Sequence, residues 1–195
     1  MTQATTVLLC GVGGQGTITA ADLLARAALS AGKQAKVSEI HGMAQRGGAV
    51  TTVVRFGDEV KTMMADIGNT DCIVSFETTE ALRNIPFLKQ GGFLLVADET
   101  IKPLPVACGR ASMPAHAREK LVDLGAVLIP AHSLALQAGN AKCENVVILG
   151  ALESRLGFGE DVWVDVIKGR VPPKTIDANV RAFHLGLEFA TSQQQ

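Results

Sequence analysis

The feature that most constrains this chain is a glycine-rich turn between an apolar run and a helical run. Residues 8–29 read LLCGVGGQGTITAADLLARAAL, in which Gly11, Gly13 and Gly16 fit the pattern G-x-G-x-x-G. This order is typical of a strand, a tight turn and a helix N-terminus in an α/β fold. Such a turn presents backbone N–H groups beside the positive end of a helix dipole, and it therefore favours phosphate or carboxylate. The same glycines would also suit a helix that packs tightly on its strand without any ligand.

Glycine patterns of this kind occur in two kinds of nucleotide site, dinucleotide-binding turns and P-loops. A dinucleotide-binding enzyme needs an acidic residue about 20 positions beyond the glycines, and Glu39 stands near that position. The sequence therefore leaves open a free-standing oxidoreductase that binds NAD or FAD. A P-loop is excluded, because Thr17-Ile18 occupies the positions where Lys and then Ser or Thr must contact phosphate and metal.

A second motif, EIHGMAQRGGAV at residues 39–50, has no place in the ordinary dinucleotide pattern. Its glycines beside a fixed cation, Arg46, suit close approach by an anion or by another backbone. The alternatives are a solvated surface arginine and, for His41, a loop histidine without a functional role. The candidate contact residues of this loop are Glu39, His41, Gly42, Met43, Arg46, Gly47 and Gly48.

Taken together, GVGGQG and EIHGMAQRGGAV resemble the gamma-type subunits of 2-oxoacid:ferredoxin oxidoreductases. Within that family, the loop is most similar to the small (beta) subunit of indolepyruvate ferredoxin oxidoreductase, which reads His-Gly-Met-x-x-Arg-Gly-Gly. Shorter matches continue in order over nearly all 195 residues, among them Asn145 before a Leu-Gly-Ala-Leu run and Asn179-x-x-Ala182-Phe183.

The resemblance implies a supporting subunit of an enzyme that decarboxylates a 2-oxoacid on thiamine diphosphate. It further implies that electrons pass through iron–sulfur clusters to ferredoxin and that the acyl group passes to coenzyme A. Thiamine diphosphate, magnesium and the clusters are then expected on a large partner subunit, with coenzyme A as a possible shared ligand. No catalytic residue is expected on this chain, and its expected ligand or partner contacts are the loop residues above with Gly11, Gly13, Gly14, Gln15 and Gly16. A non-enzymatic module that binds acyl-CoA or a nucleotide remains an alternative.

The four cysteines argue against a redox centre on this chain itself. Cys10, Cys72, Cys108 and Cys143 lie far apart, and no two form C-x-x-C. Iron–sulfur clusters and zinc sites normally need closely spaced thiolates or paired histidines. We therefore expect no metal on this chain, and we interpret Cys10 and Cys72 as small buried strand residues.

Composition points to a soluble protein without nucleic-acid or membrane partners. The net charge is −1 and the chain has one Trp and no Tyr, which disfavours electrostatic or base-stacking contact with nucleic acid. No apolar run reaches the 18 or so residues of a membrane span. The start, MTQATTVLLCGV, lacks a basic leader, so we expect a cytoplasmic protein.

The hydrophobic pattern predicts one domain over residues 1–195 with a Rossmann-like, doubly wound α/β fold. A mostly parallel sheet should carry helices on both faces, because runs such as CIVSF and FLLVA are continuously apolar. Gly57-Asp58-Glu59 suggests a turn into a short antiparallel strand. Residues 101–115, with three prolines, should be irregular. The expected strands are 5–10, 34–39, 50–56, 71–76, 92–97 and 126–130, and the expected helices are 16–31, 78–90, 116–124, 132–138, 145–156, 160–168 and 174–190.

Overall fold

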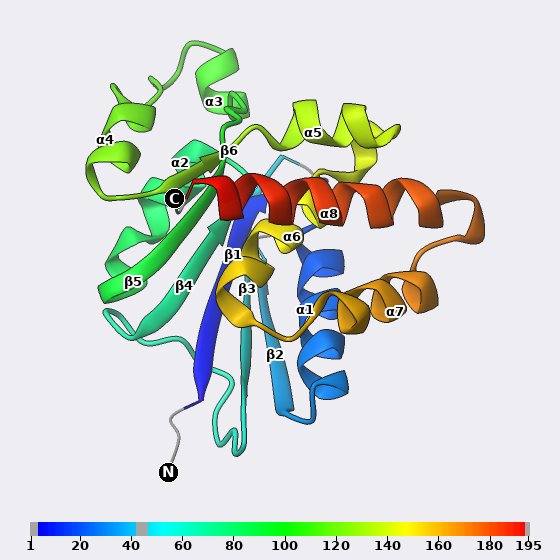
Figure 1. The fold of residues 1–195 in the computed structure, drawn as a ribbon. Helices are drawn as coiled ribbons and strands as arrows, with labels where there is room; N and C mark the ends of the chain where they lie inside the picture. Colours follow the sequence, from blue (N-terminus) through cyan, green and yellow to red (C-terminus); the bar gives the residue numbers. More distant parts are fainter. Residues whose placement is uncertain (1–3, 42–46, 194–195) are drawn as a thin grey trace.

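The computed structural model describes residues 4–41 and 47–193. Its centre is a six-stranded sheet with the order β2-β3-β1-β4-β5-β6 (Figure 1). The strands are β1 (Thr5–Val12), β2 (Gln34–His41), β3 (Ala49–Gly57), β4 (Thr70–Ser75), β5 (Leu88–Ala97) and β6 (Val127–Ile129). All six expected strands are present.

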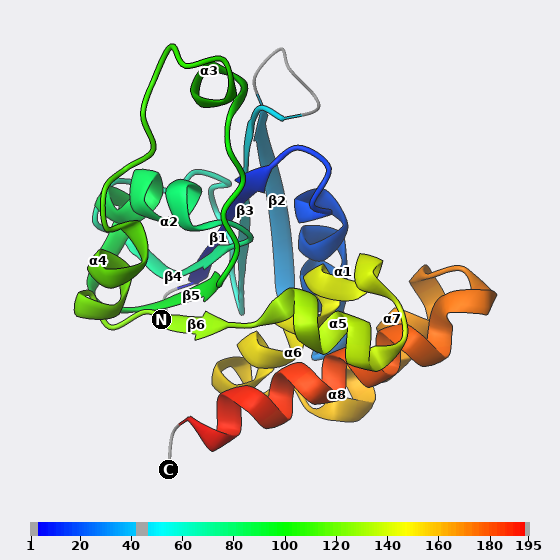
Figure 2. The same cartoon turned by 90° about the horizontal axis from the view of Figure 1, so that it is seen from above.

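Helices cover both faces of the sheet, as Figure 2 shows. They are α1 (Thr17–Ser30), α2 (Thr78–Asn84), α3 (Leu104–Ala107), α4 (Ala117–Asp123), α5 (Ala131–Ala138), α6 (Glu144–Leu156), α7 (Glu160–Arg170) and α8 (Ile176–Ser192). Alternate residues of β1 feed two separate cores, as strand geometry requires: Val7 and Leu9 pack towards α1, α6 and α8, whereas Leu8 and Cys10 pack towards α2 and α4. The predicted α/β class with a doubly wound, mostly parallel sheet is confirmed.

One strand, β3, runs against the others. It pairs antiparallel with both neighbours, so that Val54 lies opposite Val7 of β1 and opposite Val37 of β2. The antiparallel strand predicted beyond the turn at 57–59 is wrong, because residues 58–69 form no strand. The antiparallel partners of β3 come earlier in the chain, and hydrophobic periodicity identifies strands without identifying their neighbours.

The helix predicted over residues 78–90 is wrong at its C-terminal end. α2 ends at Asn84, a short 3-10 turn covers Ile85–Phe87, and residues 88–90 already belong to β5. Pro86 is consistent with the early end, because proline has no N–H group with which to continue the helical hydrogen bonds. The irregular stretch 101–115 contains one short helix, α3.

Helices α6 and α8 meet backbone to backbone. A Cβ atom at Gly150 would lie 1.9 Å from the carbonyl oxygen of Phe183, and one at Gly186 would lie 1.9 Å from that of Val147. Every residue of α6 from Asn145 to Glu153 is buried. These glycines therefore let α6 lie deep against the sheet, with its N-terminus beside the turn that follows β1.

We expect Gly150→Ala to lower the free energy of unfolding by about 1–3 kcal/mol, because the added methyl group forces the two backbones apart. Gly169→Ala in α7 is the matched control, since its Cβ would meet no atom within 4 Å. That control should gain up to about 1 kcal/mol from helix propensity. Urea unfolding of both variants measures the difference, and equal effects would contradict the packing argument.

Candidate functional site

The two glycine motifs of the sequence meet in the structure. The Gly13 N–H donates to the Gly48 carbonyl oxygen at 2.8 Å, and the Gly47 N–H donates to the Gly13 carbonyl oxygen at 3.3 Å. The turn after β1 and the segment entering β3 are therefore joined at the C-terminal edge of β1. Open α/β sheets place their ligand crevices at this edge.

Gln15 fixes the shape of the turn. Its Oε1 accepts a hydrogen bond from the Val12 N–H, and its Nε2 donates to the Phe76 carbonyl oxygen, each at 2.7 Å. A Cβ atom at Gly11 would lie 2.8 Å from Gln15 Oε1, so the first glycine of the motif makes room for this side chain. Gln15 thus has a positioning role that the sequence pattern did not indicate.

The backbone N–H groups of Gly14 and Gly16 are the candidate ligand donors of this turn. Gly14 and Gly16 have φ values of +111° and +81°, which glycine tolerates best. No acceptor in the described part of the chain takes the N–H group of either residue. Helix α1 follows with no side-chain cap and no acidic residue in its first turn. This end of α1 therefore has the properties of an anion-binding helix N-terminus.

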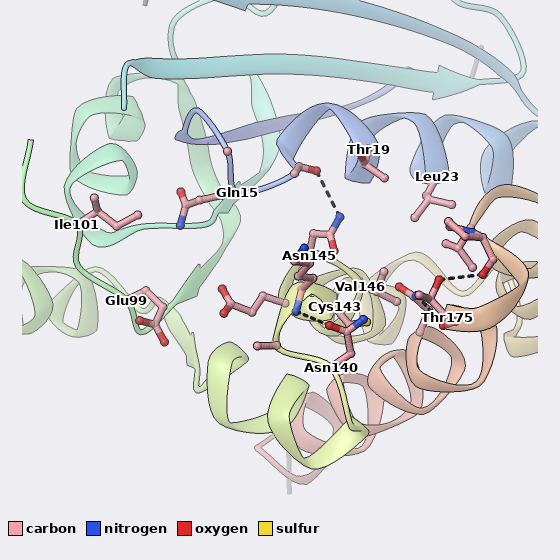
Figure 3. Close-up of a pocket in the computed structure, with 18 residues that line it drawn as sticks. Gln15, Thr19, Leu23, Glu99, Ile101, Asn140, Cys143, Asn145, Val146 and Thr175 are labelled. Atoms are coloured by element: carbon pink, nitrogen blue, oxygen red, sulfur yellow. Dashed lines mark hydrogen bonds between the residues drawn. The ribbon is translucent and has the colours of Figure 1, made fainter. Parts of the chain in front are cut away.

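A pocket of about 770 Å³ opens beside these free donors (Figure 3). Its volume lies in the range that holds cofactor-sized molecules. The starts of three helices line it: Thr19 of α1, Asn145 of α6, and Thr175 with Asn179 at the start of α8. The positive ends of three helix dipoles thus converge on one pocket, which favours a negatively charged ligand.

Asn145 and Asn179, which enter the sequence analysis only as matches to the family, both line the pocket. Asn145 Nδ2 donates to the Gly16 carbonyl oxygen at 3.4 Å, and a Cβ atom at Gly16 would lie 2.9 Å from the same nitrogen. Asn179 Nδ2 donates to the Thr175 carbonyl oxygen at 2.8 Å. Only the fold joins Asn145 to a turn 129 positions earlier, so no local pattern identifies it.

The pocket also contains carboxylates. Glu99 and Glu144 line it, and His132 Nδ1 lies 2.5 Å from Glu144 Oε1. Burial, followed by the charge of Glu144, raises the pKa of the Glu99 carboxyl. Lys142 is the one basic side chain that lines the pocket among the described residues. The pocket therefore offers both backbone N–H donors and carboxylate acceptors.

The His132–Glu144 pair predicts a measurable pH dependence. The hydrogen bond and charge of Glu144 raise the pKa of His132 above its ordinary value of 6.5. The pair therefore stabilises the fold below about pH 6.5, and this contribution disappears as the pH rises through the higher folded-state pKa. An NMR titration of the imidazole should give a midpoint above 6.5 that falls in Glu144→Gln. An unchanged midpoint in that variant would contradict this origin of the shift.

Glu39, one of the predicted contact residues, does not line this pocket. Glu39 is exposed on β2, and β3 separates β2 from β1, so Glu39 lies roughly 10 Å to the side of the strand that enters the turn. An acidic residue that holds a ribose belongs on the neighbouring strand, and this placement therefore disfavours the NAD or FAD alternative. His41 ends β2, whereas Gly42, Met43 and Arg46 lie outside the described residues.

Two of the four cysteines are buried in strands, as the sequence analysis expects. Cys10 and Cys72 are buried, and burial raises the pKa of both thiols, that of Cys10 to about 12. Cys143 is also buried, whereas Cys108 is exposed. Within residues 4–41 and 47–193, no group of three or more His, Cys, Asp or Glu side chains is placed to hold a metal ion. None of the helices in these ranges is long and apolar enough to cross a membrane.

Comparison with known proteins identifies relatives over the whole fold. The family model for pyruvate ferredoxin/flavodoxin oxidoreductase matches residues 6–189. Indolepyruvate oxidoreductase subunit IorB of Thermococcus kodakarensis is 45% identical, covering 94% of this chain and 95% of that protein. IorB of Archaeoglobus fulgidus is 35% identical, covering 95% of each. Pyruvate synthase subunit PorC of Thermotoga maritima is 30% identical, covering 91% of this chain and 90% of that protein.

Solved structures show the same fold. The keto/oxoacid ferredoxin oxidoreductase gamma subunit of Geobacter sulfurreducens matches with a TM-score of 0.72 and 25% identity, covering 96% of this chain and 99% of that one. A 2-oxoglutarate:ferredoxin oxidoreductase from Magnetococcus marinus matches in fold with a TM-score of 0.71 and 20% identity, covering 98% of this chain but 32% of that chain. The resemblance inferred from the two glycine motifs is confirmed, and the chain belongs to the pyruvate ferredoxin/flavodoxin oxidoreductase family.

Proposed function

We propose that this chain is the small subunit of a thiamine-dependent 2-oxoacid:ferredoxin oxidoreductase. The complex would decarboxylate indolepyruvate or another aryl 2-oxoacid oxidatively, form the acyl-CoA and pass the electrons to ferredoxin. The match of 45% identity to an indolepyruvate oxidoreductase subunit over nearly the full length supports this assignment. The His-Gly-Met-x-x-Arg-Gly-Gly loop at residues 41–48 supports the same substrate class.

In this proposal the large partner subunit holds thiamine diphosphate, magnesium and the iron–sulfur clusters. Among the described residues, no group of three or more His, Cys, Asp or Glu side chains is placed to hold a metal ion, and Cys10 and Cys72 are buried. An iron–sulfur cluster needs several thiolates brought together. Decarboxylation and electron exit therefore belong to the partner, and the small subunit acts on the step that involves coenzyme A.

The observation that carries this role is the open pocket beside the N–H groups of Gly14 and Gly16, which have no acceptor within residues 4–41 and 47–193. Those donors and the uncapped start of α1 suit the pyrophosphate of coenzyme A. The carboxylates of Glu99 and Glu144 in the same pocket suit amide or amine N–H groups of the same molecule. Bound in this way, coenzyme A supplies the thiol that accepts the acyl group, while this chain fixes where the molecule lies.

We propose ligand or partner contacts for the remaining predicted residues as well. Gly13, Gly47 and Gly48 connect the turn to the loop of residues 41–48, so the loop enters β3 beside the pocket. Arg46 directly precedes these glycines in sequence, and we propose it as a cation for the phosphates or for the partner's active-site mouth. His41, Gly42 and Met43 are proposed as partner contacts of the same loop.

A charge placed at the start of α1 tests this proposal. Thr19 is exposed and lines the pocket, and Thr19→Glu adds an acidic residue to a first turn that has none. The reconstituted complex should show a KM for coenzyme A raised about tenfold, because the carboxylate repels the phosphates. Formation of the enzyme-bound intermediate from the 2-oxoacid should be unchanged.

Thr19→Gln is the neutral control and should leave the KM for coenzyme A near the wild-type value. The free energy of unfolding of Thr19→Glu should not fall, since an acidic first-turn residue stabilises a helix by about 0.3–1 kcal/mol. A normal KM in Thr19→Glu, or equal loss of both half-reactions, would contradict a role of this pocket in coenzyme A binding.

A further inference from the structure

Three large apolar side chains are exposed on the face of β2 and β3 opposite α1. Ile40 at the end of β2 is 58% exposed, and Met63 and Met64 in the segment after β3 are 49% and 62% exposed. These three residues border a hollow of about 190 Å³ and are called the apolar patch below. Contiguous exposed apolar side chains on a folded surface mark sites of protein association.

The segment that carries the two methionines is held in place by β2 and β3. Arg55 of β3 donates from Nη1 to Thr62 Oγ1 at 2.9 Å and to the Met64 carbonyl oxygen at 3.4 Å. The Val60 N–H donates to Gln34 Oε1 of β2 at 3.2 Å, and the Val60 side chain is buried. These contacts fix the backbone on both sides of the methionines. Their exposure is therefore a property of the fold.

The hollow has the size and chemistry of a side-chain socket. Besides the apolar patch it is lined by Leu8, Ser38, Thr51, Val53, Ala65, Asn84 and Phe87, none of which is charged. Its volume lies below the roughly 300–1,000 Å³ of pockets that hold small-molecule ligands. An uncharged hollow of this size suits one or two apolar side chains of a partner protein, and methionines at its rim can adapt to their shape.

We infer that the apolar patch docks the large subunit, with an apolar side chain of that subunit inserted in the hollow; this rests on the proposed function. Two features favour this occupant. Ile40 lies one residue before His41, at the start of the loop that the Gly13–Gly48 and Gly47–Gly13 bonds tie to the coenzyme A pocket. A protein seated on the patch would therefore also lie against the candidate site.

The second feature is the outer edge of β2. This strand of eight residues ends the sheet, and among the described residues no further strand pairs with it. Native proteins usually cover or blunt such an edge. In the Magnetococcus marinus protein, the same fold accounts for about a third of a single chain, so there it is covalently joined to further protein. A large subunit that packs over β2 and the apolar patch would cover both the outer edge of the strand and the exposed apolar side chains.

Met64→Glu in the small subunit tests this inference by measuring affinity for the purified large subunit. The equilibrium dissociation constant should rise on the order of thirtyfold, because a carboxylate would be buried in an apolar contact. Met64→Leu should stay within about threefold of wild type, since leucine keeps the apolar volume. Leu124→Glu is the matched control, because Leu124 is 53% exposed and lies at the end of α4, outside the hollow. It should bind as wild type does.

Unfolding of the isolated Met64→Glu chain should match wild type, and Met64→Gln serves as a second variant if it does not. Wild-type affinity in the folded variants would overturn the inference. Unchanged affinity for the large subunit with lost self-association of the small chain would assign the patch to a second copy and would equally overturn it. If the wild-type chain fails to bind the large subunit at all, the proposed function itself falls and this inference falls with it.

Discussion

The side-chain amide of Gln15 is the contact on which the site depends. By accepting from the Val12 N–H and donating to the Phe76 carbonyl oxygen, it joins the end of β1 to the segment that follows β4. The glycine turn can then bond through Gly13 to the entrance of β3, while no acceptor among the described residues takes the N–H groups of Gly14 and Gly16. The turn is thus rigid at its base and has unused donors at its tip, which is the arrangement that preorganised anion binding requires.

The second wall of the pocket depends on how closely α6 approaches. Gly150 and Gly186 let α6 and α8 touch through their backbones, and this depth brings Asn145 to the Gly16 carbonyl oxygen. The result is a pocket built from the starts of three helices that are far apart in sequence. Its two carboxylates, Glu99 and Glu144, explain why the pocket suits a ligand with both phosphates and N–H donors better than a simple anion.

Local patterns in the sequence predicted the strands, most helix positions and the glycine turn, because alternation, glycine spacing and an Ala/Leu-rich helix are short-range signals. The antiparallel insertion of β3 between β1 and β2 was not predicted, since strand order depends on long-range pairing. That insertion is what moves Glu39 away from the turn. Gln15 lines the pocket while its amide is engaged within the fold, and Asn145 enters the sequence analysis only as a match to the family. The partners of these two side chains lie 61 and 129 positions away, so no local pattern indicates either contact.

The measurement that tests the account most directly is a structure of the reconstituted complex with coenzyme A bound. We expect pyrophosphate oxygens to lie within hydrogen-bond distance of the Gly14 and Gly16 nitrogens, with the large subunit covering the open side of the pocket. This expectation would be contradicted by coenzyme A whose phosphates are held by the large subunit alone, with the glycine turn of this chain facing solvent.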